Sequence, residues 1–300
     1  MTTFTGRVGV IGATSLVGEC LLPLLIERGW EVVAFSRRMQ DTQHRLKNLL
    51  VDWQLLRQEE SSDDGNIPTT EKQISHWICL APIWVLPEYF PLLSLYGAKH
   101  VVAISSTSRF TKDNSSDPAE QALAERLVDG EQLFIGWAEK NQVLWTILRP
   151  TLIYGLGRDK NIGVIARFIQ RFAFSPLLGE AQGLRQPVHA HDVALGCLAA
   201  LNAEKAFNRS YNISGGETLP YRAMVERIFL VLGRKPRFVT LPLWIFRGTV
   251  FCLRVLPRFR HWSVAMAERM NQDLVFDHED ASRDLGFCPR PFLLTREDIS

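Results

Sequence analysis

The stretch RVGVIGATSLVGE, residues 7–19, predicts a buried strand, a glycine-punctuated turn and the start of a helix. Gly12 ends the strand, where the backbone must turn sharply. Gly18 begins the helix, where a missing Cβ permits close helix–strand packing. The free N–H groups and positive dipole end of such a helix bind a pyrophosphate.

Ser15 stands where a third glycine is typical. With a negative φ a serine fits there, and its hydroxyl can donate to phosphate. The alternative is an ordinary strand–helix turn. We expect these dinucleotide-binding residues: Gly12, Thr14, Ser15, Leu16, Val17 and Gly18.

Composition indicates an ordinary globular chain, with 46% apolar and 22% charged residues in 300. This length suits one large α/β domain with a smaller appendage. A net charge of +2 does not favour a nucleic-acid partner. The five cysteines lie far apart without a CxxC pair, so we expect no metal site, no disulfide scaffold and a reducing compartment.

No targeting signal is predicted at the N-terminus. The most apolar stretch, 239–257, is interrupted by Arg247 and Arg254, so we do not expect it to span a membrane. We interpret it as a helix covering the core of a C-terminal subdomain. The alternative is an interfacial helix, because the cations Arg258 and Arg260 lie beside Trp262. The chain is expected to be cytoplasmic, with peripheral membrane or protein contact through 239–262 as an option.

Apolar runs alternate with helical patterns through the first half of the chain, which is typical of a parallel sheet with crossover helices. The predicted strands are 7–12, 31–36, 48–53, 76–81, 98–106, 144–150 and 210–214, and the longest predicted helix covers 118–140. We therefore predict an α/β fold: a doubly wound Rossmann-like parallel sheet with a small mixed C-terminal lid subdomain. Residues 1–160 would form the dinucleotide-binding domain, to which later segments return, and 161–300 mainly the substrate and lid subdomain.

Several motifs occur in a recognisable order along the chain: GATSLVG (12–18), ISSTS (104–108), ILRPTLIYGLGRD (147–159), QPVHAHDVA (186–194), YNISGGE (211–217) and DASRDLGFCPRPF (280–292). Together they resemble the extended short-chain dehydrogenase/reductases, the nucleotide-sugar epimerase/dehydratase group. The resemblance covers nearly the whole chain and implies the same Rossmann-type fold and a bound nicotinamide dinucleotide.

The end of the second strand bears on which dinucleotide is bound. An NAD site usually carries an acid there for the ribose diol, whereas this chain has Ser36, Arg37 and Arg38. Two guanidiniums and a hydroxyl suit a 2′-phosphate. The pattern favours NADP(H) over NAD(H); the alternative is that the arginines are solvated loop charges.

Other cofactor contacts are expected at the carboxyl ends of neighbouring strands. The resemblance implies that Asp52 accepts from the adenine amine, with Trp53 against the ring. It also implies that 80–82 line the ribose and pyrophosphate. The remaining predicted cofactor-binding residues are Leu80, Ala81, Pro82, Ser105 and Pro150.

The family's Tyr-xxx-Lys pair is missing. The resemblance places this pair on the helix before the sixth strand, where the tyrosine transfers a proton and the lysine binds the nicotinamide ribose. No tyrosine occurs between Tyr96 and Tyr154. If Glu131 matches the acidic residue after the motif, Leu123 and Leu127 hold the two places.

Some catalytic candidates remain. Thr107 occupies the position of the family's catalytic hydroxyl, or else only caps a strand end. Tyr154 is a candidate replacement acid, and His189 and His191 are others, although histidines at such places more often have a structural role. Asp192 is expected to cap the helix that follows it. The substrate-binding candidates are Arg185 and His189.

Two functions stay open at this point. One is a nucleotide-binding protein without the usual redox turnover, like the accessory subunit of respiratory complex I, which is similar to these enzymes and lacks the same pair. The other is an active NADP-dependent oxidoreductase or epimerase on a nucleotide sugar or related hydroxylated substrate. A third, less favoured, is a reductase or isomerase that depends on hydride transfer alone.

Overall fold

The computed structural model describes residues 6–37, 50–56, 73–113, 115–159, 161–241 and 268–299. Its centre is a parallel sheet of seven strands in the order β11-β6-β5-β4-β1-β2-β3. The strands are β1 (Arg7–Ile11), β2 (Glu31–Ser36), β3 (Val51–Leu55), β4 (His76–Cys79), β5 (His100–Ile104), β6 (Leu144–Pro150) and β11 (Arg209–Ile213).

The strand order reverses at β1, which pairs with β2 on one side and β4 on the other. A parallel sheet that reverses in this way opens a crevice at the carboxyl ends of its central strands. This arrangement confirms the predicted α/β, Rossmann-like fold. The segments that follow β1, β2, β4, β5 and β6 therefore lie at the same edge of the sheet.

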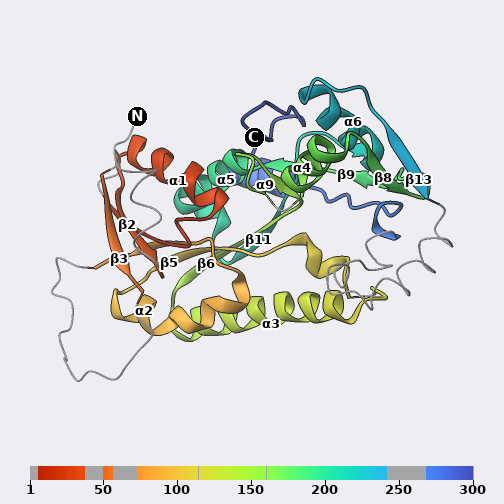
Figure 1. Cartoon of the computed structure of the whole chain (residues 1–300). Coiled ribbons are helices and arrows are strands. Elements are labelled where there is room, and N and C mark those ends of the chain that lie inside the picture. The colour runs from red at the N-terminus through yellow and green to blue at the C-terminus, as the bar shows by residue number, and fades with distance from the viewer. Residues whose placement is uncertain are drawn as a thin grey trace.

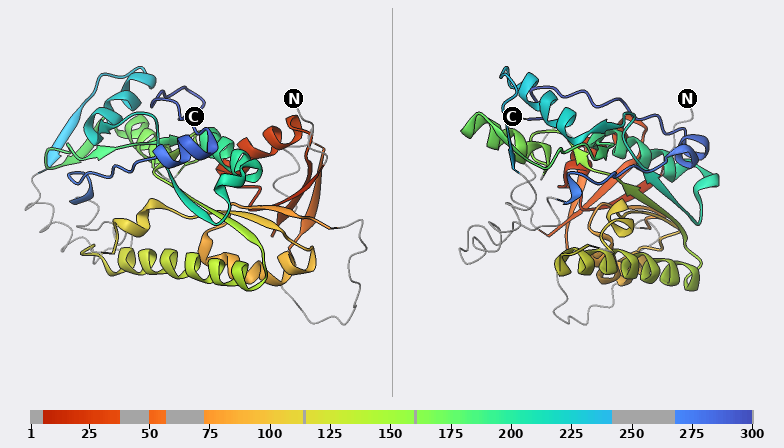
Figure 2. Two further views of the ribbon diagram at one scale, coloured as in Figure 1. Left: turned by 180° about the vertical axis from the view of Figure 1, so that it is seen from behind. Right: turned by 90° about the vertical axis from the view of Figure 1, so that its right-hand side faces the viewer.

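Helices cover both faces of the sheet (Figure 1). One face carries α1 (Leu16–Glu27), α5 (Ala190–Asn202) and α9 (Glu279–Leu285), and the other carries η2 (Ile83–Tyr89), α2 (Phe90–Leu95) and α3 (Pro118–Lys140). The two further views in Figure 2 agree, with α3 running along the face opposite α1 and α5. Each face has its own apolar core, because strands that are buried on both sides contribute side chains alternately to the two.

A smaller group of elements lies at one end of the molecule (Figure 1). It contains the helices α4 (Ile162–Phe172) and α6 (Tyr221–Val231) and six short strands that pair as β7 (Ile153–Tyr154) with β10 (Val188–His189), β8 (Ser175–Leu178) with β13 (Phe238–Leu241), and β9 (Leu184–Arg185) with β12 (Leu219–Pro220). Its main core is separate from those of the sheet and includes Tyr154, Phe229 and Phe292. We call this group the lid.

Most predicted elements are confirmed, including the helix over 118–140 to the residue. Several predicted strand ends differ by one to three residues, and two differences bear on the site. The third strand covers Val51–Leu55 rather than 48–53. Helix α5 begins at Ala190, so its N-cap is His189 and Asp192 lies inside the first turn. Most of the apolar stretch 239–262 lies outside the described residues. In the described part of the chain, no helix has the length and apolarity to cross a membrane.

Candidate functional site

The turn after β1 has the geometry of a close-approach site. Gly12 adopts a φ of +79°, and a Cβ there would lie 2.8 Å from the Ala81 nitrogen. A Cβ on Gly18 would lie 2.2 Å from the Ala13 carbonyl oxygen. Both positions therefore need glycine, the first for its backbone conformation and its neighbour, the second for helix–turn contact.

Ser15 replaces the third glycine without strain. Its φ is −71°, and its hydroxyl oxygen accepts a hydrogen bond of 3.1 Å from the Gly18 N–H, so it is the N-cap of α1. The hydroxyl proton is still available to an anion. The N–H groups of Leu16 and Val17, the first two helical residues, have no acceptor within the helix. Thr14 is exposed beside them, so this end of α1 can bind a phosphate.

The first turn of α1 also contains an acid. Glu19 forms an ion pair with Arg158, which lies in the loop after β7. This pair joins the lid to α1 and compensates a negative charge close to the predicted phosphate. The sequence gives no sign of it, because 139 residues separate the two side chains and only the fold brings them together.

The segment after β4 closes one side of the crevice. The Leu80 N–H donates to the Ile11 carbonyl over 2.8 Å, and the Leu80–Ala81 backbone lies against Gly12. Pro82, the next residue, is exposed and begins η2. The predicted residues 80–82 are therefore brought together with the glycine turn.

The end of β2 is cationic. Ser36 is buried, and Arg37 follows it on the surface, whereas Arg38 lies outside the described residues. Burial raises the pKa of the Tyr89 phenol, and the nearby Arg37 guanidinium opposes that rise. Arg37 is thus close to η2 at the carboxyl edge of the sheet, and the described end of β2 has no acid.

The predicted adenine contact is displaced. Because β3 covers Val51–Leu55, Asp52 lies within the strand, opposite Val33, rather than after its end. Ser36, at the carboxyl end of β2, is opposite Leu55. Leu55 lies three residues, or about 10 Å, beyond Asp52 along the strand. Asp52 is exposed and accepts from Gln54, while Trp53 packs against the core beside α1. This geometry argues against an adenine-binding role for either residue.

A buried carboxylate organises the ends of β5 and β6. Glu131 of α3 is 1% exposed and accepts a hydrogen bond of 2.5 Å from the Ser105 hydroxyl. It also pairs with Arg149, whose Nη2 lies 2.6 Å away, and with Arg109 of η3 (Thr107–Phe110). Burial lowers the pKa of both guanidiniums, and Arg149 adds to the effect on Arg109. Arg109 was not predicted; no local pattern marks it.

The Thr107 hydroxyl lies beside this cluster. It is 5% exposed and donates a hydrogen bond of 3.3 Å to the carbonyl of Pro150, the last residue of β6. Its oxygen lone pairs can still accept a hydrogen bond from a ligand. Thr107, Ser105 and Pro150 are therefore brought together, but the bond to Pro150 equally fits a structural role.

The helix α3 presents apolar side chains where the resemblance implies the Tyr-Lys pair. Leu127 and Leu123 lie one and two turns before Glu131, on the same side of the helix. Leu127 is 2% exposed and Leu123 packs against the same core. The one lysine of α3 is Lys140, in its last turn.

Tyr154 is not poised for proton transfer. Its side chain is fully buried in the lid core, and its hydroxyl donates over 3.5 Å to the Leu293 carbonyl. Its ring packs edge-on against His189 and Phe292. Burial, reinforced by the charge of Asp298, raises the pKa of Tyr154. The placement argues against this residue as the replacement acid.

The two substrate candidates are engaged inside the lid. The Arg185 guanidinium is 5% exposed and donates to the carbonyls of Leu184, Gln272 and Arg269. His189 caps α5: its Nδ1 accepts from the His191 N–H, so Nε2 donates to the Asp298 carboxylate at 3.1 Å. These bonds occupy both side chains and do not favour substrate contact.

Asp192 also differs from expectation. Its buried carboxylate accepts from the backbone and guanidinium of Arg290, which fastens the C-terminal segment to α5.

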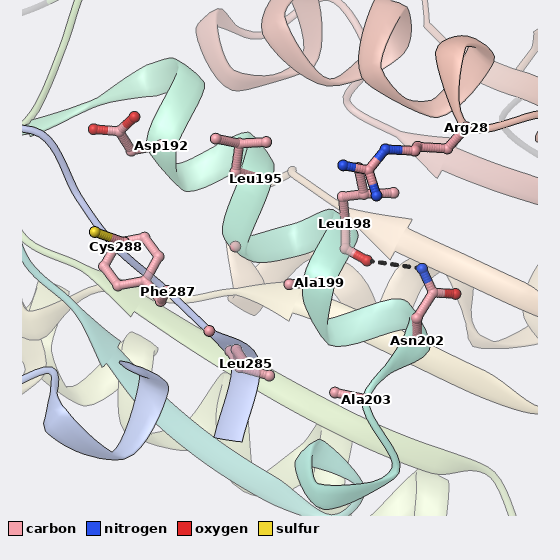
Figure 3. A pocket seen from close by; sticks show the side chains of 12 residues that line it. Arg28, Asp192, Leu195, Leu198, Ala199, Asn202, Ala203, Leu285, Phe287 and Cys288 are labelled. Atoms are coloured by element: carbon pink, nitrogen blue, oxygen red, sulfur yellow. Dashed lines mark hydrogen bonds between the residues drawn. The ribbon is translucent and has the colours of Figure 1, made fainter. Parts of the chain in front are cut away.

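A hollow of about 450 Å³ lies beside α5, with Asp192 in its wall (Figure 3). Its walls include Arg28, at the opposite end of α1 from the glycine turn, and Phe287 and Cys288 after α9. None of the predicted site residues lines it.

Comparisons with known proteins agree with this architecture. Residues 92–214 match the model of the NAD dependent epimerase/dehydratase family. The fold is shared with a UDP-glucuronic acid 4-epimerase from Bacillus cereus, solved with UDP-glucuronic acid and NAD, at a TM-score of 0.70 and 16% identity over 97% of this chain and 96% of that one. Fold and matched residues thus define an α/β protein of Rossmann type. The resemblance to the extended short-chain dehydrogenase/reductases of the epimerase/dehydratase type is confirmed.

Two curated relatives have names that do not describe an epimerase. An uncharacterized protein of Sinorhizobium fredii is 24% identical over 94% of this chain and 74% of its own length. The mitochondrial NADH dehydrogenase (ubiquinone) 1 alpha subcomplex subunit 9 of Arabidopsis thaliana is 29% identical over 32% of this chain and 24% of its own length. The second alignment therefore spans about a quarter of that subunit.

Proposed function

We propose that this protein binds a nicotinamide dinucleotide at the carboxyl edge of its sheet, NADP(H) in preference to NAD(H), without the Tyr-Lys redox cycle of the epimerases. The observation that carries the proposal is the register of α3. Glu131 accepts hydrogen bonds from Ser105 and Arg149, and these contacts support Glu131 as the acid that follows the family motif. Leu123 and Leu127 then stand in the two catalytic places.

The dinucleotide site is supported by the turn at Gly12 and the capped start of α1. The turn leaves no room for a side chain at Gly12 or Gly18, and the helix offers unpaired N–H groups with a positive dipole end. The preference for NADP(H) rests on Arg37 beside the buried Ser36, since a guanidinium binds a 2′-phosphate by charge-assisted hydrogen bonds.

The lack of turnover follows from the chemistry of the replaced pair. General acid–base catalysis typically contributes on the order of 10²–10⁴-fold to such a step. Two leucines can neither donate a proton nor bind the nicotinamide ribose. A dinucleotide held in this way serves as a structural or sensing ligand, and the match to an NADH dehydrogenase subunit supports an accessory role of that kind.

The alternative function is an oxidoreductase or epimerase on a nucleotide sugar with an unorthodox acid. It is favoured by the shared fold with an epimerase solved with UDP-glucuronic acid, and by the Thr107 hydroxyl beside the crevice. Tyr154, Arg185 and His189 lend it little support, because internal hydrogen bonds occupy all three.

Binding and turnover are separated by one set of measurements on the purified chain. Bound nucleotide is identified by mass spectrometry after denaturation, and NADPH and NADH are titrated by calorimetry. The reduced nicotinamide absorbance and the sugar composition are then followed with UDP-glucose and UDP-glucuronic acid. We expect NADPH to bind and neither sugar to be converted. Sugar conversion at rates typical of enzymes, near 1–10³ s⁻¹, would contradict the proposal and establish the alternative.

The cofactor preference has its own variant. Arg37→Ala should weaken NADPH on the order of tenfold and leave NADH unchanged, because only NADPH carries the phosphate that the guanidinium would bind. The matched control is Arg126→Ala, an exposed arginine on the outer side of α3. Equal affinities of the unmodified chain for NADPH and NADH would disprove the preference.

A further inference from the structure

Three phenylalanines gather at the C-terminal end of α4 and just after it, in the lid. The ring of Phe168 lies 4.7 Å from that of Phe172 and 5.5 Å from that of Phe174. Phe172 is 49% exposed, on a helix whose other large apolar side chains include the buried Ile162 and Ile169. Phe172 differs from a single exposed apolar residue because the half-buried rings of Phe168 and Phe174 adjoin it, and a contiguous apolar patch can mark an interaction site.

Cations surround the aromatic cluster. The Arg171 guanidinium lies 5.5 Å from the centre of the Phe172 ring. Arg234, after α6, donates to the Ile169 and Gln170 carbonyls at 3.0 Å each, which brings the run of Arg234, Lys235 and Arg237 against the end of α4. We call Phe168, Phe172, Phe174, Arg171, Arg234, Lys235 and Arg237 the lid tip.

The segments that build the lid tip contain no acid. Residues 161–178 and 228–241 carry no Asp or Glu and five Arg or Lys, although the whole chain has a net charge of only +2. The rest of the chain is therefore net acidic. No carboxylate of the described residues forms an ion pair with the four cations of the lid tip, all of which are exposed.

We propose that the lid tip docks on an anionic lipid surface. Exposed aromatic rings enter the interface between headgroups and acyl chains, while flanking cations are attracted to anionic headgroups. A protein partner of ordinary composition would not require this strict exclusion of acids. This inference goes beyond the proposed function, and it stands whether or not a dinucleotide is bound.

The test is co-sedimentation of the full chain with vesicles of phosphatidylcholine alone, or of phosphatidylcholine with phosphatidylglycerol. We expect binding to the anionic vesicles only, and its loss at high salt, because exposed charges are screened. The triple variant Arg171→Glu, Lys235→Glu, Arg237→Glu should lower the vesicle partition coefficient on the order of 100-fold. Phe172→Ser should lower it roughly tenfold.

Each variant has a control of the same kind. Lys99→Glu, Arg126→Glu and Lys140→Glu together change the net charge equally, at exposed positions on or near the opposite face. Leu133→Ser removes a comparably exposed apolar group, 57% exposed, from α3. Thermal unfolding and NADPH titration of every variant show whether the fold and the dinucleotide site are intact.

Three results with vesicles would overturn the inference. They are equal binding to neutral and anionic vesicles, equal loss in the lid-tip and control variants, and unchanged binding after charge reversal at the lid tip. The last result would assign vesicle binding to another part of the chain. Binding of a nucleic-acid duplex through the lid tip, in place of vesicles, would also refute it.

Discussion

The Ser105 hydroxyl donates to Glu131 over 2.5 Å, and this contact joins the end of β5 to the middle of α3. The same carboxylate pairs with Arg109 and Arg149, so four segments of the chain meet at one charge. Two guanidiniums on one acid leave a net positive charge beside Thr107. The cluster therefore fixes α3 against the sheet and makes the region between the ends of β5 and β6 cationic.

Replacing Glu131 tests how much of the fold depends on this contact. Glu131→Gln leaves two half-buried guanidiniums without their counter-ion, and breaking such a pair costs about 3–5 kcal/mol. We expect the free energy of unfolding, measured with urea, to fall by that amount. Glu139→Gln, an exposed change in the same helix, should alter it by less than about 0.5 kcal/mol. Similar values for the two variants would contradict the assignment.

The dinucleotide site is tested at Gly18. In Gly18→Ala the new methyl group would meet the Ala13 carbonyl at 2.2 Å, so the turn and helix must separate. We expect a loss of stability of roughly 1–3 kcal/mol and a loss of NADPH affinity on the order of tenfold or more. Calorimetric titration and thermal unfolding measure both.

Gly136 of α3 provides the control, because a Cβ there has no atom within 4 Å. Gly136→Ala should raise the free energy of unfolding by up to about 1 kcal/mol and leave NADPH binding unchanged. An intact affinity in Gly18→Ala would show that the pyrophosphate does not bind at this turn.

The role of Tyr154 can be decided by removing one atom. Among the described residues, the Tyr154 hydroxyl forms one long hydrogen bond, to the Leu293 carbonyl at 3.5 Å, so Tyr154→Phe should cost less than about 1 kcal/mol of stability. NADPH affinity and any measurable turnover should stay as they are. Turnover abolished in this variant, with binding retained, would make Tyr154 the missing acid.

Stability should depend on pH through His100. This histidine is 2% exposed, bonds to Thr146 at 3.1 Å, and has its pKa lowered to about 4 by burial and then by the charge of His76. In the unfolded chain its pKa is about 6.5. Because the pKa of His100 is lower in the folded chain, its contribution to the free energy of unfolding is complete above about pH 6.5. This contribution is lost as the pH falls toward 4. The loss amounts to about 3 kcal/mol.

The measurement compares urea unfolding of the unmodified chain and of His100→Gln from about pH 7 to pH 4. The amide keeps a hydrogen-bonding group near Thr146 but does not titrate. The difference in unfolding free energy between the two chains should shrink on acidification. A constant difference would show that His100 is accessible to protons in the folded state.

The sequence contains enough information for the sheet but not for all of its boundaries. Central strands such as β1 and β5 are buried on both sides, so their apolar runs mark them clearly. The edge strand β3 is half-exposed and mixes Asp52 with Trp53, so its pattern does not define its ends. That shift of about three residues is what removes Asp52 from the predicted adenine site.

Side chains whose roles depend on distant segments were the least predictable. Arg185 looks like a free cation in the sequence, yet its partners are carbonyls near residue 270. Tyr154 follows a strand end that points toward the crevice, yet its hydroxyl turns to a carbonyl 139 residues further along the chain. By contrast, Gly12, Ser15 and Gly18 are explained by local geometry, and the sequence pattern was sufficient there.

The pairing of β11 with β6 has a practical consequence for anyone who divides this protein. A fragment ending near residue 160 would lose β11. The backbone amides and carbonyls on that side of β6 would then form an open strand edge, which can pair with other molecules. It would also strip α5 from α1 and leave the flank of that helix bare. We therefore expect the N-terminal half to aggregate when it is expressed alone.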